Sequence, residues 1–168
     1  MSTEIYRIEG PWRGTLGISA HPRGGDWLED EIKSWRGAGF DVIVSLLTPA
    51  EMQEMDLRRE ADYARAAHLE FISFPIEDRS VPQSRESVLK LIEQLESRLA
   101  RGKNVNVHCR QGIGRSALIA AGLLIARGVP SAEAVARIST ARHVTVPETP
   151  EQRDWIRSLV PTAHPTVS

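Results

Sequence analysis

One short segment of the sequence brings a sulfur nucleophile, two glycines and an arginine close together. Cys109 is the only cysteine of the chain, and Arg115 follows it after five intervening residues. Gly112 and Gly114 allow the backbone between them to curl around a bound group without steric conflict. A loop that leads into a helix presents its backbone N–H groups to an anion, and an arginine can hold two oxygens of that anion. The spacing therefore predicts an oxyanion site with a thiolate nucleophile.

Two neighbours of this loop have predicted supporting roles. Ser116, directly after the arginine, is expected to hydrogen-bond the sulfur of Cys109 and to support it as a leaving group. His108, directly before the cysteine, is expected to point inward and to order the loop through hydrogen bonds. The residues predicted to bind a phosphate group are Arg110, Gln111, Gly112, Ile113, Gly114 and Arg115.

Alternating strand and helix patterns surround the loop and must position it. Apolar, β-branched runs predict short strands at residues 4–8, 15–19, 41–45, 69–73 and 105–107. Helical spacing and stop signals predict helices at residues 27–35, 84–101 and 116–127, and further helices that begin at residues 131 and 149. Asp26 is the predicted N-cap of the first helix. This order predicts an α/β domain with a central, largely parallel twisted sheet flanked by helices.

Two of the expected helices begin with a capping box, in which the N-cap and the third helical residue bond each other's backbone. The first box pairs Thr48 with Glu51, and the second pairs Thr149 with Gln152. The capping box explains why a glutamate stands at position 51, and we therefore expect no catalytic role for Glu51. For Gln152 it stands beside a functional interpretation that is given below.

Length and composition indicate one globular domain, which we expect to span residues 1–160, followed by a C-terminal tail at 161–168. The chain has 168 residues, of which 26% are charged, and a net charge of -1. Such a balance predicts no nucleic-acid partner. The apolar run at residues 117–126 is too short to span a membrane. The start of the sequence lacks a signal-peptide pattern, and a single cysteine suits a reducing compartment, so we expect a cytoplasmic protein.

Several ordered motifs resemble one known superfamily. His-Cys, five residues, Arg and Ser is similar to the signature of the protein tyrosine and dual-specificity phosphatases. Residues 74–82 resemble the mobile acid loop of that superfamily and lie upstream of the cysteine, as in its dual-specificity members. Residues 46–51 and 146–152 resemble the subgroup around the kinase-associated phosphatase. The resemblance extends over residues 40–157, which is most of the chain.

The resemblance implies roles for residues outside the cysteine loop. Asp78 stands at the general-acid position of the acid loop, and its neighbour Glu77 is the competing carboxylate. Gln152 resembles a water-positioning glutamine, although the capping box explains it equally well. Arg79 and Arg110 are candidates for binding a second anionic group, or are ordinary solvated arginines.

The implied reaction is hydrolysis of a phosphomonoester through a cysteinyl-phosphate, without a metal or other cofactor. The implied substrate is phosphotyrosine in a protein, and also phosphoserine or phosphothreonine, because no segment resembles the phosphotyrosine-recognition insertion of larger relatives. The alternatives are a pseudophosphatase that binds phosphorylated partners, a phosphatase of a small metabolite or nucleotide, and a rhodanese-like enzyme of sulfur or arsenate. The sequence leaves the oligomeric state open.

Overall fold

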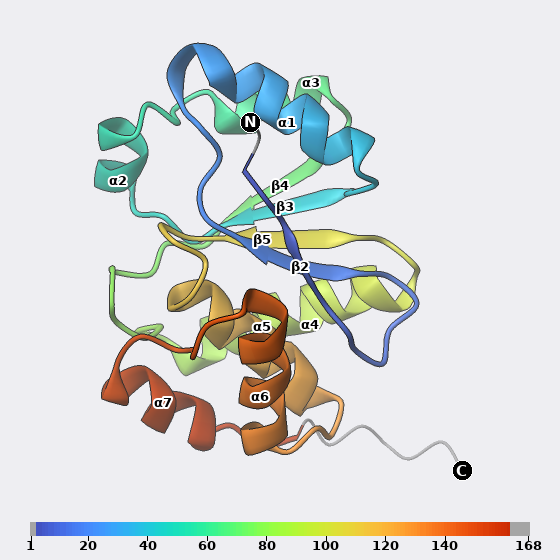
Figure 1. Ribbon diagram of the computed structural model, residues 1–168, viewed down its shortest axis with the longest axis vertical. Helices are drawn as coiled ribbons and strands as arrows, with labels where there is room; N and C mark the ends of the chain where they lie inside the picture. Colours follow the sequence, from blue (N-terminus) through green and yellow to red (C-terminus); the bar gives the residue numbers. More distant parts are fainter. Residues whose placement is uncertain (1–2, 162–168) are drawn as a thin grey trace.

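The computed structural model describes residues 3–161 as a layered α/β fold (Figure 1). A five-stranded sheet has the order β1-β2-β5-β3-β4, in which only β1 runs antiparallel to its neighbour. The strands are β1 (Tyr6–Ile8), β2 (Leu16–Ser19), β3 (Val42–Ser45), β4 (Glu70–Ser73) and β5 (Val105–His108). The predicted largely parallel sheet is confirmed. The predicted tail at 161–168 lies outside the described residues, apart from Pro161.

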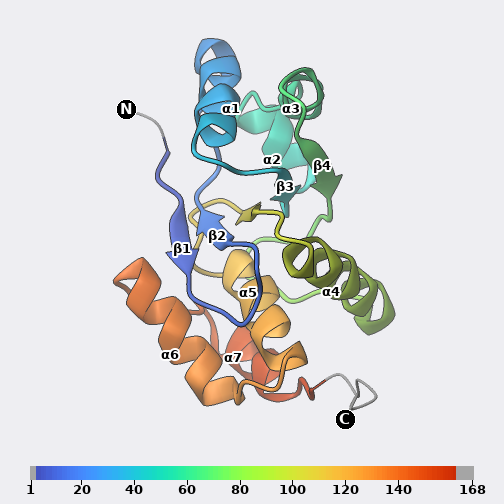
Figure 2. The same ribbon diagram turned by 90° about the vertical axis from the view of Figure 1, so that its right-hand side faces the viewer.

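Helices cover both faces of the sheet, as Figures 1 and 2 show. On one face lie α1 (Leu28–Gly37), α2 (Pro49–Glu54) and α3 (Glu60–Ala66). On the other face lie α4 (Arg85–Ala100), α5 (Arg115–Ala126), α6 (Ser131–Arg142) and α7 (Pro150–Arg157). Each face of the sheet therefore has its own hydrophobic core. A strand that is covered on both faces needs apolar residues throughout, which explains the apolar runs of β3 and β5.

Helix α5 is buried along its whole length, as the apolar run at residues 117–126 predicts. It packs directly against α4, because a Cβ atom at Gly122 would lie 2.5 Å from Cδ1 of Ile92. The α4 residues that were expected on one face are all buried, namely Val88, Leu91, Ile92, Leu95 and Leu99. This packing fixes the start of α5, and with it the loop that precedes it.

The start of the first predicted helix differs from expectation. A short 3-10 turn, η1 (Gly25–Trp27), precedes α1, and Asp26 lies inside this turn instead of capping a helix. The backbone here packs tightly on the end of α2, since Gly25 N–H donates to the carbonyl of Asp56 at 3.0 Å. A Cβ at Gly24 would lie 2.0 Å from the carbonyl oxygen of Met55. This close approach, which depends on tertiary structure, overrides the local capping signal.

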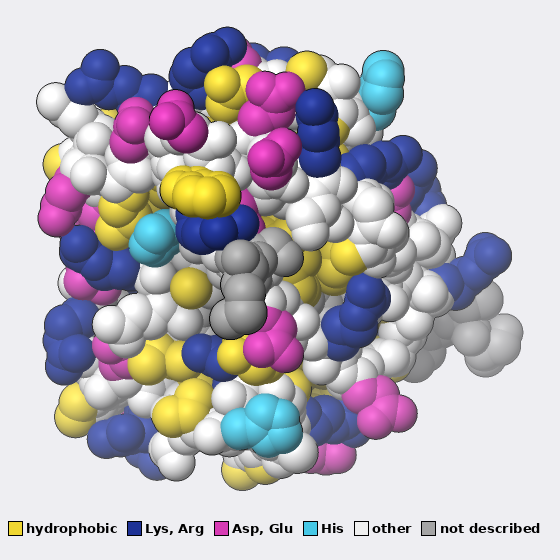
Figure 3. Space-filling model, turned by 45° about the horizontal axis from the view of Figure 1, so that its top comes forward, with side chains coloured by type: hydrophobic (Ala, Val, Ile, Leu, Met, Phe, Trp, Pro, Cys, Tyr) yellow, Lys and Arg dark blue, Asp and Glu magenta, His cyan; other side chains and the backbone are white. Residues whose placement is uncertain are grey.

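The surface is mixed in charge on the face that Figure 3 displays, where basic and acidic side chains are interspersed. This distribution agrees with the net charge of -1. Within residues 3–161, no helix is long and apolar enough to cross a membrane.

Candidate active site

The loop that joins β5 to α5 lies at the carboxyl end of the central strand. β5 pairs in parallel with β2 on one side and with β3 on the other. The carboxyl ends of parallel strands meet at one edge of a sheet, where ligands bind. Figure 1 shows this loop at the same edge as the segment after β4 and the segment before α7. Three stretches that are distant in sequence therefore converge on Cys109.

Cys109 is buried, with 1% of its surface exposed, and its sulfur accepts a hydrogen bond from the backbone. The donor is the N–H of Gly112, at 3.2 Å from Sγ. Gly112 has a φ of +75°, and a Cβ atom there would lie 2.4 Å from the carbonyl carbon of Ser19. Only glycine suits both constraints, so at this position the loop curls back onto its own cysteine.

Arg115 is the first residue of α5 and is 1% exposed. Its Nη1 and Nη2 donate to the two carboxylate oxygens of Glu51 at 2.6 and 2.8 Å. Nη1 also donates to the carbonyl of Ile76 at 2.8 Å, and Nη2 to Oδ1 of Asp78 at 3.1 Å. None of its described hydrogen bonds within residues 3–161 uses Nε. On the edge formed by Nε and Nη2, the acceptor within the described residues is therefore Asp78.

The electrostatics of this pair follow from burial opposed by hydrogen bonding. Burial alone would lower the pKa of Arg115, but the hydrogen bond to Glu51 and the charges of Cys109, Glu51 and Asp78 together raise it. For Glu51, burial alone would raise the pKa, but the bonds to Arg115 and Thr48 hold it below its ordinary value. The pair is thus ionised, which keeps the guanidinium in one place beneath the loop.

Asp78 and Glu77 differ in what they contact. The Asp78 side chain is 41% exposed and reaches Arg115. Glu77 is exposed and lines a separate pocket of about 340 Å³ beside Phe74 and Val81. Of the two carboxylates, Asp78 is the one that the structure brings to the cysteine loop.

Gln152 is fully buried and makes both kinds of contact that a carboxamide allows. Its Oε1 accepts from the N–H groups of Glu148 and Thr149 at 3.1 and 3.2 Å, which completes the predicted capping box. Its Nε2 donates to the carbonyl of Ser80 at 3.0 Å. Gln152 therefore ties the start of α7 to the loop that carries Asp78.

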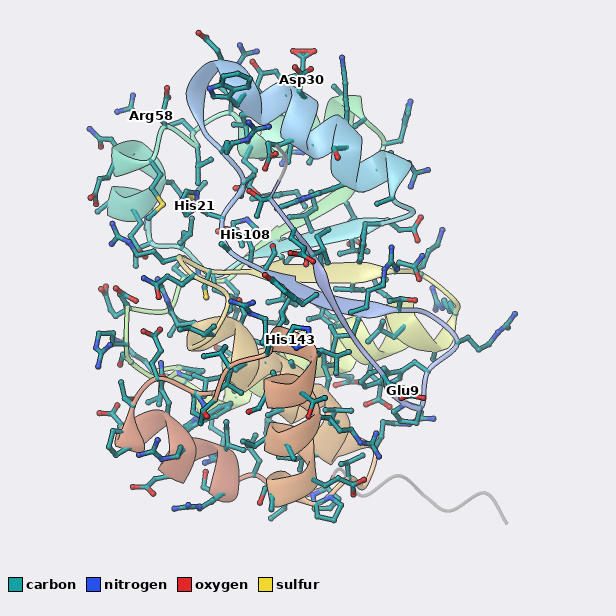
Figure 4. The ribbon with its side chains drawn as sticks, viewed as in Figure 1. Glu9, His21, Asp30, Arg58, His108 and His143 are labelled. Atoms are coloured by element: carbon teal, nitrogen blue, oxygen red, sulfur yellow. The ribbon has the colours of Figure 1, made fainter. Side chains whose placement is uncertain are left out.

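The two neighbours of the loop differ from expectation in their contacts. The Ser116 hydroxyl is buried and has no hydrogen-bond partner within the described residues, so it does not bond the sulfur here. His108 does point inward (Figure 4), but its Nε2 lies 2.6 Å from Oε2 of Glu60 in α3 and not against the loop. Its ring lies beside Trp35, with the centroids 5.9 Å apart. His108 thus connects β5 to the helices of the opposite layer.

Carboxylates neutralise both arginines that were considered for a second anion. Arg79 lies 3.3 Å from Glu148, and Arg110 lies 3.2 Å from Glu54. Neither is a free cation in this structure, so a second anionic group would have to displace these partners.

Sequence reasoning missed two carboxylates of this region. Glu51 is both the capping residue that was predicted and the bidentate partner of Arg115. Glu60 pairs with His108, and nothing in the sequence signals it, because the two residues lie in different layers. Within residues 3–161, no group of three or more metal-ligating side chains is placed to hold a metal ion.

Comparison with known proteins places the chain in the protein tyrosine and dual-specificity phosphatase superfamily, in agreement with its motifs. The chain belongs to the family described as "Polymorphic toxin system, DSP-PTPase phosphatase", whose model matches residues 17–129. The resemblance seen in the motifs is thereby confirmed at the level of the superfamily.

Individual relatives support the same class. "Putative tyrosine phosphatase 197R" of Invertebrate iridescent virus 6 is 28% identical over 157 residues, which are 92% of this chain and 56% of that protein. The chain thus spans little more than half the length of this relative. Crystal structures of the kinase-associated phosphatase, with its catalytic-site cysteine replaced by serine, and of Tk-PTP in its active form are also similar.

Both structures cover nearly the whole chain. The kinase-associated phosphatase has a TM-score of 0.84 at 19% identity, covers 93% of each chain and is similar in fold. Tk-PTP has a TM-score of 0.75 at 27% identity and covers 92% of this chain and 95% of its own. The predicted likeness to the kinase-associated subgroup is confirmed for the fold.

Proposed function

We propose that this phosphatase hydrolyses phosphomonoesters through a covalent intermediate on Cys109. The observation that carries the proposal is the backbone N–H of Gly112 directed at the cysteine sulfur, at 3.2 Å, in a loop whose following helix begins with Arg115. A backbone N–H and a helix N-terminus both favour negative charge at this position. These groups stabilise a thiolate at Cys109 and donate hydrogen bonds to the oxygens of a bound phosphate group. Residues Arg110 to Arg115 are the ones expected to bind that phosphate group.

In the first step, the Cys109 thiolate forms a bond to phosphorus while the bond from phosphorus to the ester oxygen breaks. Arg115 holds two phosphate oxygens along its Nε–Nη2 edge, so the phosphate must displace Asp78 from Nη2. Once displaced, Asp78 in its acid form gives its proton to the departing oxygen. The contact between Asp78 and Arg115, at 3.1 Å, keeps the acid loop close before the substrate arrives.

In the second step, ionised Asp78 takes a proton from water, whose oxygen attacks the cysteinyl-phosphate. The bond from sulfur to phosphorus breaks, and the sulfur leaves as a thiolate. The Ser116 hydroxyl, buried and without a partner in the described chain, is available to donate to this thiolate. His108 pairs with Glu60 and thereby fixes the end of β5, which directly precedes the cysteine.

Gln152 has two proposed roles in this cycle. The motif favours a water-positioning role in the second step. The observed contacts favour a second role, in which its Nε2 holds the acid loop by the carbonyl of Ser80. We assign the second role to Gln152, because its Oε1 already accepts two backbone hydrogen bonds at the start of α7.

The substrate class proposed is phosphotyrosine in proteins, with phosphoserine and phosphothreonine as further substrates. The names of the viral relative, a tyrosine phosphatase, and of Tk-PTP support it. A nucleotide, a small metabolite or a lipid phosphate are the alternatives. A similar fold, that of PTPMT1 at 18% identity, has been solved with PI(5)P. Lipid phosphatases of the superfamily typically carry lysines within the cysteine loop, whereas this chain has none between Cys109 and Arg115, which argues against a lipid substrate.

The decisive experiment measures release of p-nitrophenol from its phosphate ester in the presence of EDTA. We expect turnover by the natural chain, and background turnover by Cys109→Ser, because a serine hydroxyl is not ionised and is a poor leaving group. A trapped phosphoenzyme should appear by mass spectrometry after acid quench of the natural chain and be absent in the serine variant. Retention of one tenth of the turnover by the serine variant would exclude the covalent mechanism.

A second measurement separates the substrate classes and the pseudophosphatase. Peptides with phosphotyrosine or phosphothreonine, a nucleoside monophosphate and PI(5)P in micelles are compared by kcat/KM. We expect the phosphotyrosine peptide to be hydrolysed best. Binding of the peptides by the natural chain without any turnover would instead identify a pseudophosphatase.

A further inference from the structure

The guanidinium of Arg142, at the end of helix α6, binds backbone carbonyls of the cysteine loop. Arg142 is the last residue of α6 and is half-buried. Its Nε donates to the carbonyl of Gly112 at 2.9 Å, and its Nη2 donates to the carbonyl of Gln111 at 3.2 Å. Its guanidinium carbon also lies 3.9 Å from the ring centroid of Tyr6 in β1. Figure 4 labels His143, the C-cap residue that follows α6, at the end of the helix nearest the sheet.

These two carbonyls share peptide planes with the N–H groups of the residues that follow them, Gly112 and Ile113. The carbonyl and N–H of one trans peptide point in opposite directions. The Gln111 carbonyl belongs to the same plane as the Gly112 N–H, which donates to Cys109 Sγ at 3.2 Å. The Gly112 carbonyl belongs to the same plane as the Ile113 N–H. Arg142 therefore sets the direction of two N–H groups by holding the oxygens on their far side.

The loop needs such a restraint at this point. Gly112, with its φ of +75°, joins the two planes, and glycine is the residue that restricts rotation least. Arg142 is itself fixed by its place at the end of α6 and by stacking on Tyr6. Hydrogen bonds from a charged donor are stronger than those from a neutral one. Arg142 thus links the loop at Gly112 to helix α6 and strand β1.

We propose that Arg142 is a positioning residue for the cysteine loop. It orients the N–H groups of Gly112 and Ile113 toward the sulfur and toward a bound oxyanion. The proposal rests on the proposed function in that Cys109 is the group served.

The charged groups that act on the sulfur must stay unchanged in a test. Arg115 interacts electrostatically with Cys109, and Asp78 and Glu51 accompany it. The described hydrogen bonds of Arg142 are made to loop carbonyls and to none of these groups. Replacement of Arg142 therefore leaves the contacts of Arg115 in place.

The experiment compares Arg142→Met with Arg137→Met. Arg137 lies on the same helix and pairs with Glu133 instead of the loop. Its replacement therefore removes one positive charge from α6 but no hydrogen bond to the loop. Two readouts need no turnover. The first is the rate at which iodoacetamide alkylates Cys109 across pH 5–9, and the second is the affinity for tungstate.

For Arg142→Met we expect the half-maximal alkylation rate at a higher pH and tungstate affinity reduced about tenfold, since hydrogen bonds from a charged group are lost. Turnover should fall by a similar or larger factor. Arg137→Met should match the natural chain in all three. Arg142→Lys, which keeps the charge but reaches only one carbonyl, should lie between the two.

An Arg142→Met variant with the natural alkylation profile and tungstate affinity would overturn the proposal. Should that variant unfold, Arg142→Lys decides, and a lysine variant equal to the natural chain in both readouts would overturn it. Failure of the proposed function has a different signature. In that case the natural chain itself releases no p-nitrophenol, while alkylation and tungstate binding still report on Arg142.

Discussion

Two adjacent carboxylates of the acid loop face different surroundings, and this difference predicts different effects on catalysis. Asp78→Asn should lower turnover of phenyl phosphate by about 10²–10⁴, because the departing oxygen then lacks a proton donor. The loss should be smaller for p-nitrophenyl phosphate, whose phenolate leaves readily. The alkaline limb of kcat/KM against pH should flatten in this variant, since that limb reports loss of the acid's proton.

Glu77→Gln is the matched control, because it removes one carboxylate that is exposed and turned toward another pocket. Its pH profile and its dependence on the leaving group should equal those of the natural chain. Loss of the alkaline limb in Glu77→Gln alone would show that the acid had been assigned to the wrong residue, while Cys109 and Arg115 would keep their roles.

Glu51 links stability to pH through its pair with Arg115. Burial alone would raise its pKa, but bonds to Arg115 and Thr48 lower the pKa below its ordinary value of 4.5. A group whose pKa is lower in the folded than in the unfolded state stabilises the fold above the unfolded pKa. That contribution is lost as pH falls through the folded pKa.

We therefore expect Glu51→Gln to be less stable than the natural chain at pH 7, by roughly 1–3 kcal/mol. The difference in free energy of unfolding should shrink progressively below about pH 4.5. Urea unfolding of both proteins at several pH values measures it. A difference that stayed constant down to pH 3 would mean that the carboxylate charge contributes nothing to stability.

At the residue scale, the sequence predicts what local spacing determines. The order of Cys109, the glycines and Arg115 predicts the loop, because these residues lie within one short segment of the chain. The Arg115 partner Glu51 was predicted only as a helix cap, and the contacts of Glu60 and Arg142 were not predicted at all. Such pairs form across elements, so their spacing in the chain carries no signal.

At the element scale, strands and long helices follow their hydrophobic patterns, whereas the connections do not. The helical stretch that opens at Thr48 is interrupted after α2, where Asp56 takes a φ of 55°, and resumes as α3. This break brings Glu60 to His108. Local propensity contains no such information, since the turn is stabilised by contacts with the backbone of Gly24 and Gly25.

Gln152 links α7 to the acid loop, and two substitutions that remove different contacts of this residue should therefore have different effects. Gln152→Glu keeps an oxygen acceptor for the capping box but removes the Nε2 donor to Ser80. We expect a loss of turnover of about tenfold, since a hydrogen bond that holds the acid loop is gone.

Gln152→Met removes both contacts and should also cost about 1 kcal/mol of stability through the lost cap. Thermal unfolding and kcat for a phenyl phosphate measure the two effects. Equal turnover in Gln152→Glu and the natural chain would exclude the link as a control of the acid loop.

At the scale of the whole molecule, the described residues form two hydrophobic cores, one on each face of the sheet. The larger core contains α5, with α4 and α7 on its flanks, and it carries the helix that begins with Arg115. The predicted cytoplasmic location and the predicted lack of a nucleic-acid partner stay predictions. So does the boundary between a domain at 1–160 and a tail, which a truncation tests directly.

A chain that ends at Pro161 should unfold within about 1 °C of the full chain, because it retains every core residue that the structure describes. A chain that ends at Ser158 also loses Leu159, which is 8% exposed and packs near Gly122 at the contact between α5 and α4. Loss of a buried leucine costs about 2–5 kcal/mol, so we expect the second truncation to unfold roughly 5–15 °C lower. Calorimetry and circular dichroism should give one coincident transition for the full chain, as a single domain requires. Equal destabilisation by both truncations, or two separate transitions, would refute the predicted boundary.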